Sequence, residues 1–219
     1  MRRCPCWKAP GGDITVTEMD DGPIDPLPLL GRVKIRNYRS IGSCDVSLRR
    51  LTLLVGRNGA GKSNFLDALR FVTDGLQTSL DHAIKSRGGV QAVRRKSVGH
   101  PRNFAIELTL NLPNLSRATY GFEVAARKEG GFTVRQERLT VQAPDGRVLN
   151  SFSVEDGKIR RTTELAPLPQ PVHDRLFLVV ASGIPAFRGV YDALLSMGFL
   201  IVTLFGEGRT GGGMDEKRP

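Results

Sequence analysis

Residues 56–63 read Gly-Arg-Asn-Gly-Ala-Gly-Lys-Ser. This spacing is G-x-x-x-x-G-K-[ST], the Walker A or P-loop pattern, whose backbone wraps phosphate groups when a strand precedes it and a helix follows. Residues 51–55 (Leu-Thr-Leu-Leu-Val) predict a buried strand before the loop. Residues 63–72 carry apolar side chains at helical spacing and predict a helix after it. The predicted context is therefore the one that this motif requires.

The residue types in the loop specify a chemistry. Glycine permits positive φ at Gly56, Gly59 and Gly61, so that backbone N–H groups can converge on an anion. A helix that begins near Lys62 adds unpaired N–H groups and the positive end of its dipole. Lys62 is predicted to reach the outer phosphates and Ser63 to bind Mg²⁺. The predicted contacts to ATP are Gly56, Arg57, Asn58, Gly59, Ala60, Gly61, Lys62, Ser63 and Asn64.

The charge balance predicts a polyanionic partner. The chain has 219 residues, a net charge of +10 and a pI of about 10.1, which suits nucleic acid. The densest basic cluster is Arg94, Arg95 and Lys96, with Arg87 and Arg102 nearby, and we predict that it contacts a phosphate backbone such as that of DNA. A solvated basic loop is the alternative, and the sequence leaves it open.

Several functional classes are disfavoured by composition. Three cysteines and three isolated histidines predict neither a disulfide framework nor a metal site other than the nucleotide-bound Mg²⁺. The longest apolar run, residues 199–205, is too short to span a bilayer. No apolar stretch follows the two N-terminal arginines, so we expect no signal peptide and no membrane contact. These features predict a cytoplasmic protein.

The pattern of apolar residues predicts three regions. Residues 1–29 are rich in Pro, Gly and Asp without a period, and we expect a mobile leader. Ordered structure is expected over residues 30–198, and residues 199–219 are expected to form an irregular tail. The strands expected before the loop are 32–38 and 41–48. A short helix is expected around Leu80, Ala83 and Ile84.

Strict alternation over residues 104–112 predicts a half-buried antiparallel strand. The alternation recurs around Tyr120 and over residues 132–141, with hairpin turns at 145–146 and 156–157. These segments predict an antiparallel β subdomain over about residues 103–163. Residues 176–181 are expected to form one more buried strand, and residues 190–197 a helix.

Three stretches together resemble the opening of the ABC-type ATPase heads of the RecF, SMC and OLD-like families. They are residues 34–41 (Lys-Ile-Arg-Asn-Tyr-Arg-Ser-Ile), 53–64 with the form Asn-Gly-Ala-Gly-Lys-Ser-Asn, and 66–69 (Leu-Asp-Ala-Leu). Residues 87–95 are similar to the RecF-like ATPases of the AAA family. The resemblance covers roughly residues 31–198 and implies an α/β fold: a P-loop NTPase core, as in the N-terminal lobe of an ABC ATPase, with an antiparallel β meander.

The resemblance also implies motifs that the sequence does not show. In these families a C-terminal lobe supplies a signature Ser, a Walker B Asp-Glu pair and a switch His, and two heads sandwich two ATP molecules. Residues 176–181 have the apolar part of Walker B but no acid, and residues 199–205 are followed by Gly206 and Glu207. Residues 196–198 (Ser-Met-Gly) are better interpreted as a helix end. We therefore expect the N-terminal lobe only, a truncated or frame-shifted product, with no catalytic residue to assign.

The leading functional hypothesis is an ATP-binding head of a RecF- or SMC-like ATPase. The resemblance implies ATP hydrolysis coupled to DNA repair or defence, and pairing with a second head in a homodimer. Without the Walker B carboxylates, the chain alone is expected to hydrolyse ATP barely or not at all. A nucleotide-binding module without turnover is therefore an alternative. A P-loop kinase is a weaker alternative, because such kinases alternate helices with parallel strands.

Overall fold

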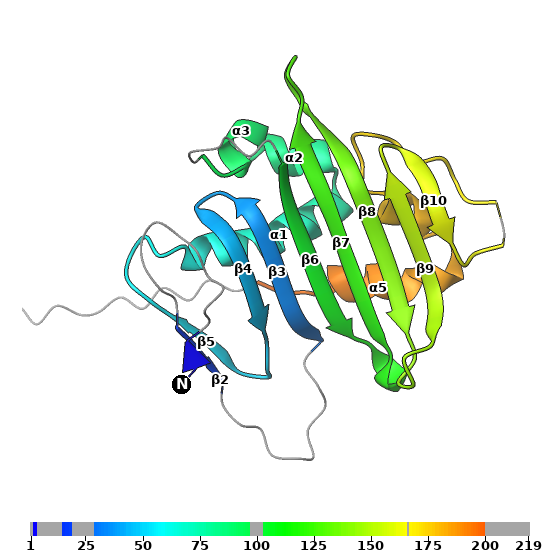
Figure 1. Ribbon diagram of the computed structural model, residues 1–219, viewed down its shortest axis with the longest axis horizontal. Coiled ribbons are helices and arrows are strands. Elements are labelled where there is room, and N and C mark those ends of the chain that lie inside the picture. The colour runs from blue at the N-terminus through cyan, green and yellow to red at the C-terminus, as the bar shows by residue number, and fades with distance from the viewer. Residues whose placement is uncertain (1, 4–14, 19–28, 97–102, 166, 200–219) are drawn as a thin grey trace, which may run out of the picture.

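The computed structural model describes residues 2–3, 15–18, 29–96, 103–165 and 167–199. A seven-stranded antiparallel sheet has the strand order β10-β9-β8-β7-β6-β3-β4, and helices α1 and α5 lie behind it in Figure 1. A smaller sheet has the order β1-β2-β5. The strands are β1 (Arg2–Arg3), β2 (Thr15–Glu18), β3 (Leu30–Tyr38), β4 (Ile41–Ser47), β5 (Thr52–Val55), β6 (Asn103–Asn111), β7 (Arg117–Ala126), β8 (Phe132–Gln142), β9 (Val148–Glu155) and β10 (Lys158–Thr162). The helices are α1 (Lys62–Gln77), α2 (Leu80–Lys85), α3 (Val90–Val93), α4 (Phe177–Ala181) and α5 (Pro185–Leu195), with a 3-10 turn, η1 (Pro113–Leu115).

The antiparallel meander predicted from the alternating pattern is present. Burial alternates residue by residue along β6, so that Phe104, Ile106 and Leu108 face the helices while their neighbours face the other way. Hairpin turns connect β8 to β9 and β9 to β10, and each pair is antiparallel. Gly146 and Gly157 take φ of 85° and 72° there, a conformation that glycine adopts without strain. The sheet therefore has one apolar face and one polar face.

Helix α1 packs its apolar side on the apolar face of the sheet. It buries Phe65, Phe71 and Leu76, among other residues. The ring of Phe71 meets those of Tyr38 on β3 and Phe104 on β6 edge to face, with centroid distances of 5.8 and 5.4 Å. Such aromatic pairs add to the stabilisation from buried area. The helix that follows the glycine loop is thus fixed to β3 and β6 of the sheet.

Residues 177–181 form helix α4, with Leu176 as its N-cap, so the strand predicted over residues 176–181 is wrong. The Glu137 carboxylate of β8 is fully buried and accepts hydrogen bonds from the backbone N–H groups of Phe177 and Leu178 at the start of α4. These N–H groups have no partner within a helix, and a carboxylate satisfies them. A short apolar run is compatible with a strand or a buried helix, and here the distant carboxylate favours the helix.

The strand before the loop is present as β5, but the prediction that it is buried is wrong. The side chains of Leu51, Leu53 and Val55 are 47%, 43% and 57% exposed. Within the described residues, β5 pairs with β2 alone, so its apolar side chains are left partly uncovered. The strand β2 was itself not expected, because four residues are too few to show a period.

Candidate nucleotide-binding site

The glycine loop turns at residues 58–61 and leads directly into α1. Gly59 and Gly61 have φ of 83° and 100°, values that favour glycine over other residues. Gly56 does not have a positive φ, so that part of the prediction is wrong: the chain is still leaving β5 there and reverses two residues later. The backbone N–H of Ala60 donates to the carbonyl of Arg57 at 3.1 Å and closes the turn.

The N-terminus of α1 provides the features of an anion-binding site. The helix begins at Lys62, its N-cap is Gly61, and no side chain caps it. No acidic residue lies in its first turn. The first N–H groups of any helix lack carbonyl partners within it. They add to the positive end of the dipole of a 16-residue helix, which favours a phosphate at this position.

Lys62 lies along the loop. Its Nζ donates to the carbonyls of Gly56 and Arg57 at 2.7 and 3.0 Å. The ammonium group is therefore held at the two residues that open the loop, while Ser63 is exposed on the first turn of α1. Arg57 and Asn58 are exposed as well. The arrangement places a positive charge and a hydroxyl on the same short segment of backbone.

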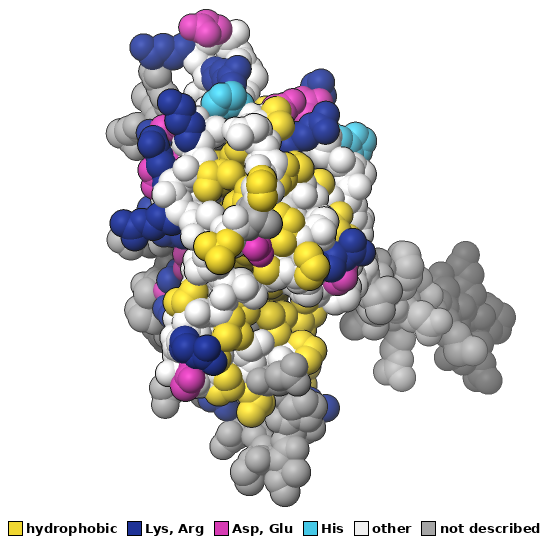
Figure 2. All heavy atoms as spheres, turned by 90° about the vertical axis from the view of Figure 1, so that its right-hand side faces the viewer, with side chains coloured by type: hydrophobic (Ala, Val, Ile, Leu, Met, Phe, Trp, Pro, Cys, Tyr) yellow, Lys and Arg dark blue, Asp and Glu magenta, His cyan; other side chains and the backbone are white. Residues whose placement is uncertain are grey.

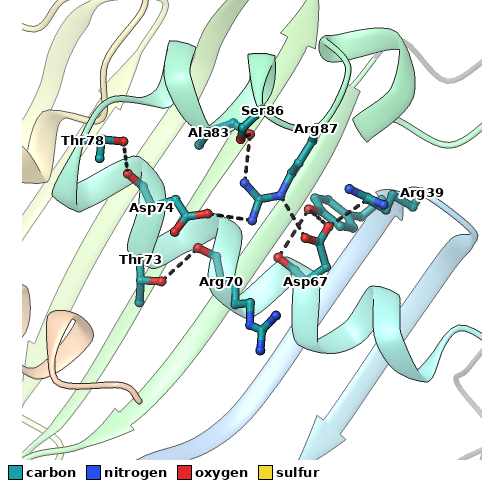
Figure 3. Close-up of polar contacts among 10 residues, drawn as sticks. Arg39, Asp67, Arg70, Thr73, Asp74, Thr78, Ala83, Ser86 and Arg87 are labelled. Atoms are coloured by element: carbon teal, nitrogen blue, oxygen red, sulfur yellow. Dashed lines mark hydrogen bonds and ion pairs between the residues drawn. The ribbon is translucent and has the colours of Figure 1, made fainter. Parts of the chain in front are cut away.

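Polar contacts tie the start of α1 to the turn between β3 and β4. Asn64 donates from Nδ2 to the Ser40 hydroxyl at 2.6 Å. One helical turn later, Asp67 accepts from the Tyr38 hydroxyl at 2.7 Å and forms an ion pair with Arg39 at 2.8 Å. Figure 3 shows the Asp67 carboxylate between Arg39 and Arg87. These contacts fix the direction in which α1 leaves the loop.

Arg87, which lies near the basic cluster in the sequence, completes this network instead of facing solvent. Its side chain is only 8% exposed and forms ion pairs with Asp67 at 3.0 Å and Asp74 at 2.8 Å (Figure 3). It also donates to the Ala83 carbonyl of α2 at 2.9 Å.

The pKa of the Tyr38 hydroxyl is raised far above its ordinary value. Burial is the largest cause, and the negative charge of the Asp67 carboxylate is the next. The Tyr38 hydroxyl therefore remains a donor to Asp67 at any physiological pH. We name Tyr38, Arg39, Asp67, Asp74 and Arg87 the Asp67 network.

The predicted nucleic-acid residues extend from α3 along the end of β3. Arg94 pairs with Tyr38 as an isolated bridge and donates from Nε to Gln91 at 2.6 Å. The backbone N–H of Arg95 donates to the Asn37 carbonyl at 2.8 Å. Arg94 and Arg95 are half-buried and Lys96 is exposed. Arg102 lies outside the described residues. The cluster is therefore smaller and more involved in the fold than its sequence suggested, and its contact with nucleic acid stays a prediction.

The comparisons with known proteins agree with the resemblance inferred from the sequence. Residues 30–113 match the model of the AAA ATPase domain. A stretch of 70 residues is 37% identical to the Old nuclease of Escherichia phage P2 and covers 29% of this chain and 12% of that protein. The two matches show similarity to AAA-type ATPases and to an OLD-family protein over the first part of the large sheet, the glycine loop and α1.

The remaining findings concern metals and membranes. Across the described ranges there is no group of three or more His, Cys, Asp or Glu side chains that could hold a metal. None of the helices there is long and apolar enough to cross a membrane. Residues 200–205 of the apolar run and the rest of the predicted tail lie outside the described residues.

Proposed function

We propose that the chain binds ATP with Mg²⁺ through residues 56–64, as the nucleotide-binding part of a RecF- or OLD-like ATPase head. One observation carries this proposal. The loop with Gly59 and Gly61 in the left-handed conformation leads into the uncapped N-terminus of α1 with Lys62 at its first position. Backbone N–H groups, a helix dipole and an ammonium group then converge on one small region.

Each part of the site has a role in this proposal. The N–H groups of the loop and of the first turn of α1 hold the phosphate oxygens. Lys62 exchanges its contacts with the Gly56 and Arg57 carbonyls for the outer phosphates, and Ser63 binds Mg²⁺. The Asp67 network holds α1 in place so that these groups are in position before ATP arrives. Preorganised donors of this kind lose little entropy on binding.

The proposal includes weak hydrolysis by the chain alone. Asp67 and Asp74, the carboxylates on α1, are both occupied by arginines. Neither is free to hold Mg²⁺ or orient an attacking water. Turnover then requires carboxylates from another part of a head or from a second head, and a role in DNA repair or defence depends on such an assembly. The alternative of a nucleotide-binding module without turnover rests on the same occupied carboxylates, Asp67 and Asp74. The antiparallel sheet argues against the other alternative, a P-loop kinase, because such kinases have parallel strands.

Equilibrium dialysis with labelled ATP tests the proposal. We expect the wild-type chain to retain ATP in Mg²⁺ and to retain much less when EDTA is added. Ser63→Ala should bind ATP without this dependence on Mg²⁺, because the hydroxyl ligand is gone. Ser182→Ala, a distant hydroxyl that bonds the Val179 carbonyl, is the matched control and should behave as wild type. The nucleotide recovered from the protein should be ATP rather than ADP. ATP retention that changes neither when Mg²⁺ is removed nor when Ser63 is replaced would contradict the proposal.

A further inference from the structure

A β-bulge directs one acidic side chain of β8, Glu137, into the apolar core. Burial alternates along β8 as far as Val134 and resumes at Glu137, because the extra residue Arg135 interrupts the pairing with β7. Bulges re-aim side chains in this way. Without the extra residue, position 136 would face inward and Glu137 would lie on the polar face of the sheet. Instead, Glu137 is 1% exposed and contacts the start of α4.

The hydrogen-bond donors around this carboxylate are uncharged. Its Oε1 atom accepts from the Tyr120 hydroxyl of β7 at 3.0 Å and from the backbone N–H of Leu178 at 2.8 Å. Its Oε2 atom accepts from the backbone N–H of Phe177. Across the part of the chain that the structure describes, no cation forms an ion pair with Glu137. A buried charge without a counter-ion is costly, so this position favours the neutral carboxylic acid.

Tyr120 is the one titratable side chain that acts on Glu137 within the described residues. Burial raises the pKa of the Tyr120 hydroxyl well above its ordinary value, so this group stays protonated. The residues paired with Glu137 on β7 and β9 are Phe122 and Val154, and α4 is apolar throughout. The charged and titratable side chains of the neighbouring segments are exposed, and they are Arg135, Arg138, His173, Asp174, Arg175, Arg188 and Asp192.

Helices α4 and α5, with the residues between them, form what we name the α4–α5 unit. The rings of Phe177 and Phe187 pack edge to face on Phe152 of β9, with centroid distances of 5.0 and 5.3 Å. The Tyr191 hydroxyl donates to the Leu76 carbonyl of α1 at 3.3 Å. The unit contributes no strand to either sheet. Its backbone is therefore attached to the sheet through the buried carboxylate, and its side chains supply the remaining contacts.

The α4–α5 unit lies at one end of the molecule. Both helices are behind the sheet on the side of β9 and β10 in Figure 1, and Figure 2 looks onto that end, where apolar side chains gather. Val172 and Val180, before and within α4, are 49% and 38% exposed. The segment that joins β10 to α4 contains Pro167, Pro169 and Pro171 and forms no helix or strand where it is described. The unit can thus open without separating the strands of the sheet.

From these observations we propose that Glu137 is a proton-controlled latch, which holds the α4–α5 unit on the sheet while it is protonated and releases the unit when it ionises. In the closed state the O–H group of the acid donates to the Tyr120 oxygen, because a hydroxyl accepts as well as donates. The two α4 amides keep their acceptors. On opening, the O–H bond breaks and the proton passes to water. The proposal goes beyond ATP binding and does not depend on it.

The pH window of the latch follows from proton linkage. Burial raises the pKa of Glu137 from 4.5 to about 7 in the closed state, and in the open state water returns it toward 4.5. Between these values the closed state keeps a proton that the open state has lost. The latch is therefore tightest below about pH 4.5, weakens about tenfold per pH unit and levels off above about pH 7. From about pH 5 to pH 7.5 the opening equilibrium should rise roughly 50-fold.

Native-state hydrogen exchange tests the latch, with each amide rate expressed as a protection factor so that the intrinsic effect of pH is removed. Protection of the Phe177 and Leu178 amides should fall roughly 50-fold from about pH 5 to pH 7.5. At either pH it should be at least about tenfold lower than in β6 and nearly insensitive to low urea concentrations, because the opening exposes little surface. Protection that does not change with pH would overturn the proposal. So would α4 and β6 amides with equal protection and equal urea dependence, because release would then require global unfolding.

Variants assign the effect to the carboxyl group. Glu137→Gln should remove most of the pH dependence of α4 protection, whereas Asp192→Asn, which alters an exposed carboxylate of the same unit, should behave as wild type. Tyr120→Phe removes a donor that lowers the pKa of Glu137, so the upper end of the window should move to higher pH; this variant decides if Glu137→Gln does not fold. The same pH dependence in Glu137→Gln and wild type, or an unmoved window in Tyr120→Phe, would contradict the latch. Lys62→Ala should leave it unchanged, which separates a failure here from a failure of ATP binding.

Discussion

Replacement of Arg87 by Ala is expected to lower the free energy of unfolding by about 3 kcal/mol. The guanidinium of Arg87 is 8% exposed and lies between Asp67 and Asp74. Its removal leaves Asp74 without a cation, Asp67 with Arg39 alone, and the Ala83 carbonyl with the Ser86 hydroxyl in place of a charged donor. Breaking a buried pair from one side costs about 3–5 kcal/mol. The lower end applies here because the Asp74 side chain is 42% exposed.

Urea unfolding followed by circular dichroism measures this effect. The matched control is Arg188→Ala on α5, whose ion pair with Asp192 is exposed on both sides. That variant should lose far less stability than Arg87→Ala, because an exposed ion pair one helical turn apart contributes little. Arg87→Lys should fall between the two, because an ammonium group cannot bridge both carboxylates as a planar guanidinium does. A loss for Arg87→Ala no larger than that of the control would show that the Asp67 network does not stabilise the fold.

Replacement of Glu137 by Gln is expected to change how stability depends on pH. Burial raises the pKa of Glu137 to about 7, and hydrogen bonds from the Leu178 and Phe177 amides and from the Tyr120 hydroxyl limit the rise. The unfolded chain releases this proton near its ordinary pKa of 4.5. Between about pH 4.5 and 7 the folded state therefore binds a proton that the unfolded state has lost. The contribution of Glu137 to stability is full below that window and falls as the pH rises through it.

The expected size of this change is about 3 kcal/mol across the window, at about 1.4 kcal/mol per pKa unit. Urea unfolding at about pH 5 and pH 7.5 measures it as the difference between wild type and Glu137→Gln, in which the contributions of all other groups cancel. Glu137→Gln should show a smaller fall than wild type. The control Glu164→Gln alters an exposed stretch after β10 and should track wild type. A parallel pH dependence in wild type and Glu137→Gln would contradict the assignment.

The nucleotide loop and its flanking elements could be predicted because the information is local. Eight residues specify where the backbone turns, and Gly59 and Gly61 take the left-handed conformation that their lack of a side chain permits. The alternation along β6 likewise predicted a half-buried antiparallel strand. In both cases the pattern and the physical requirement lie in the same short segment.

The features that the sequence did not predict depend on residues far apart in the chain. Glu137 is 40 residues from the amide of Phe177 that it bonds, so nothing near residues 176–181 indicated a helix. Asp67 and Arg87 are separated by 20 residues, and Arg87 in isolation resembled one more surface cation. Burial decides such roles, and burial depends on packing between elements.

Titration calorimetry of ATP in Mg²⁺ into wild type and Lys62→Ala tests the central claim most directly. Loss of the ammonium group should cost about 2 kcal/mol or more, as expected for charge-assisted hydrogen bonds, which is about a 30-fold weaker affinity. Lys85→Ala, an exposed lysine on α2, should bind ATP as tightly as wild type. Equal affinity of wild type and Lys62→Ala, or no measurable binding by either, would contradict ATP binding at residues 56–64.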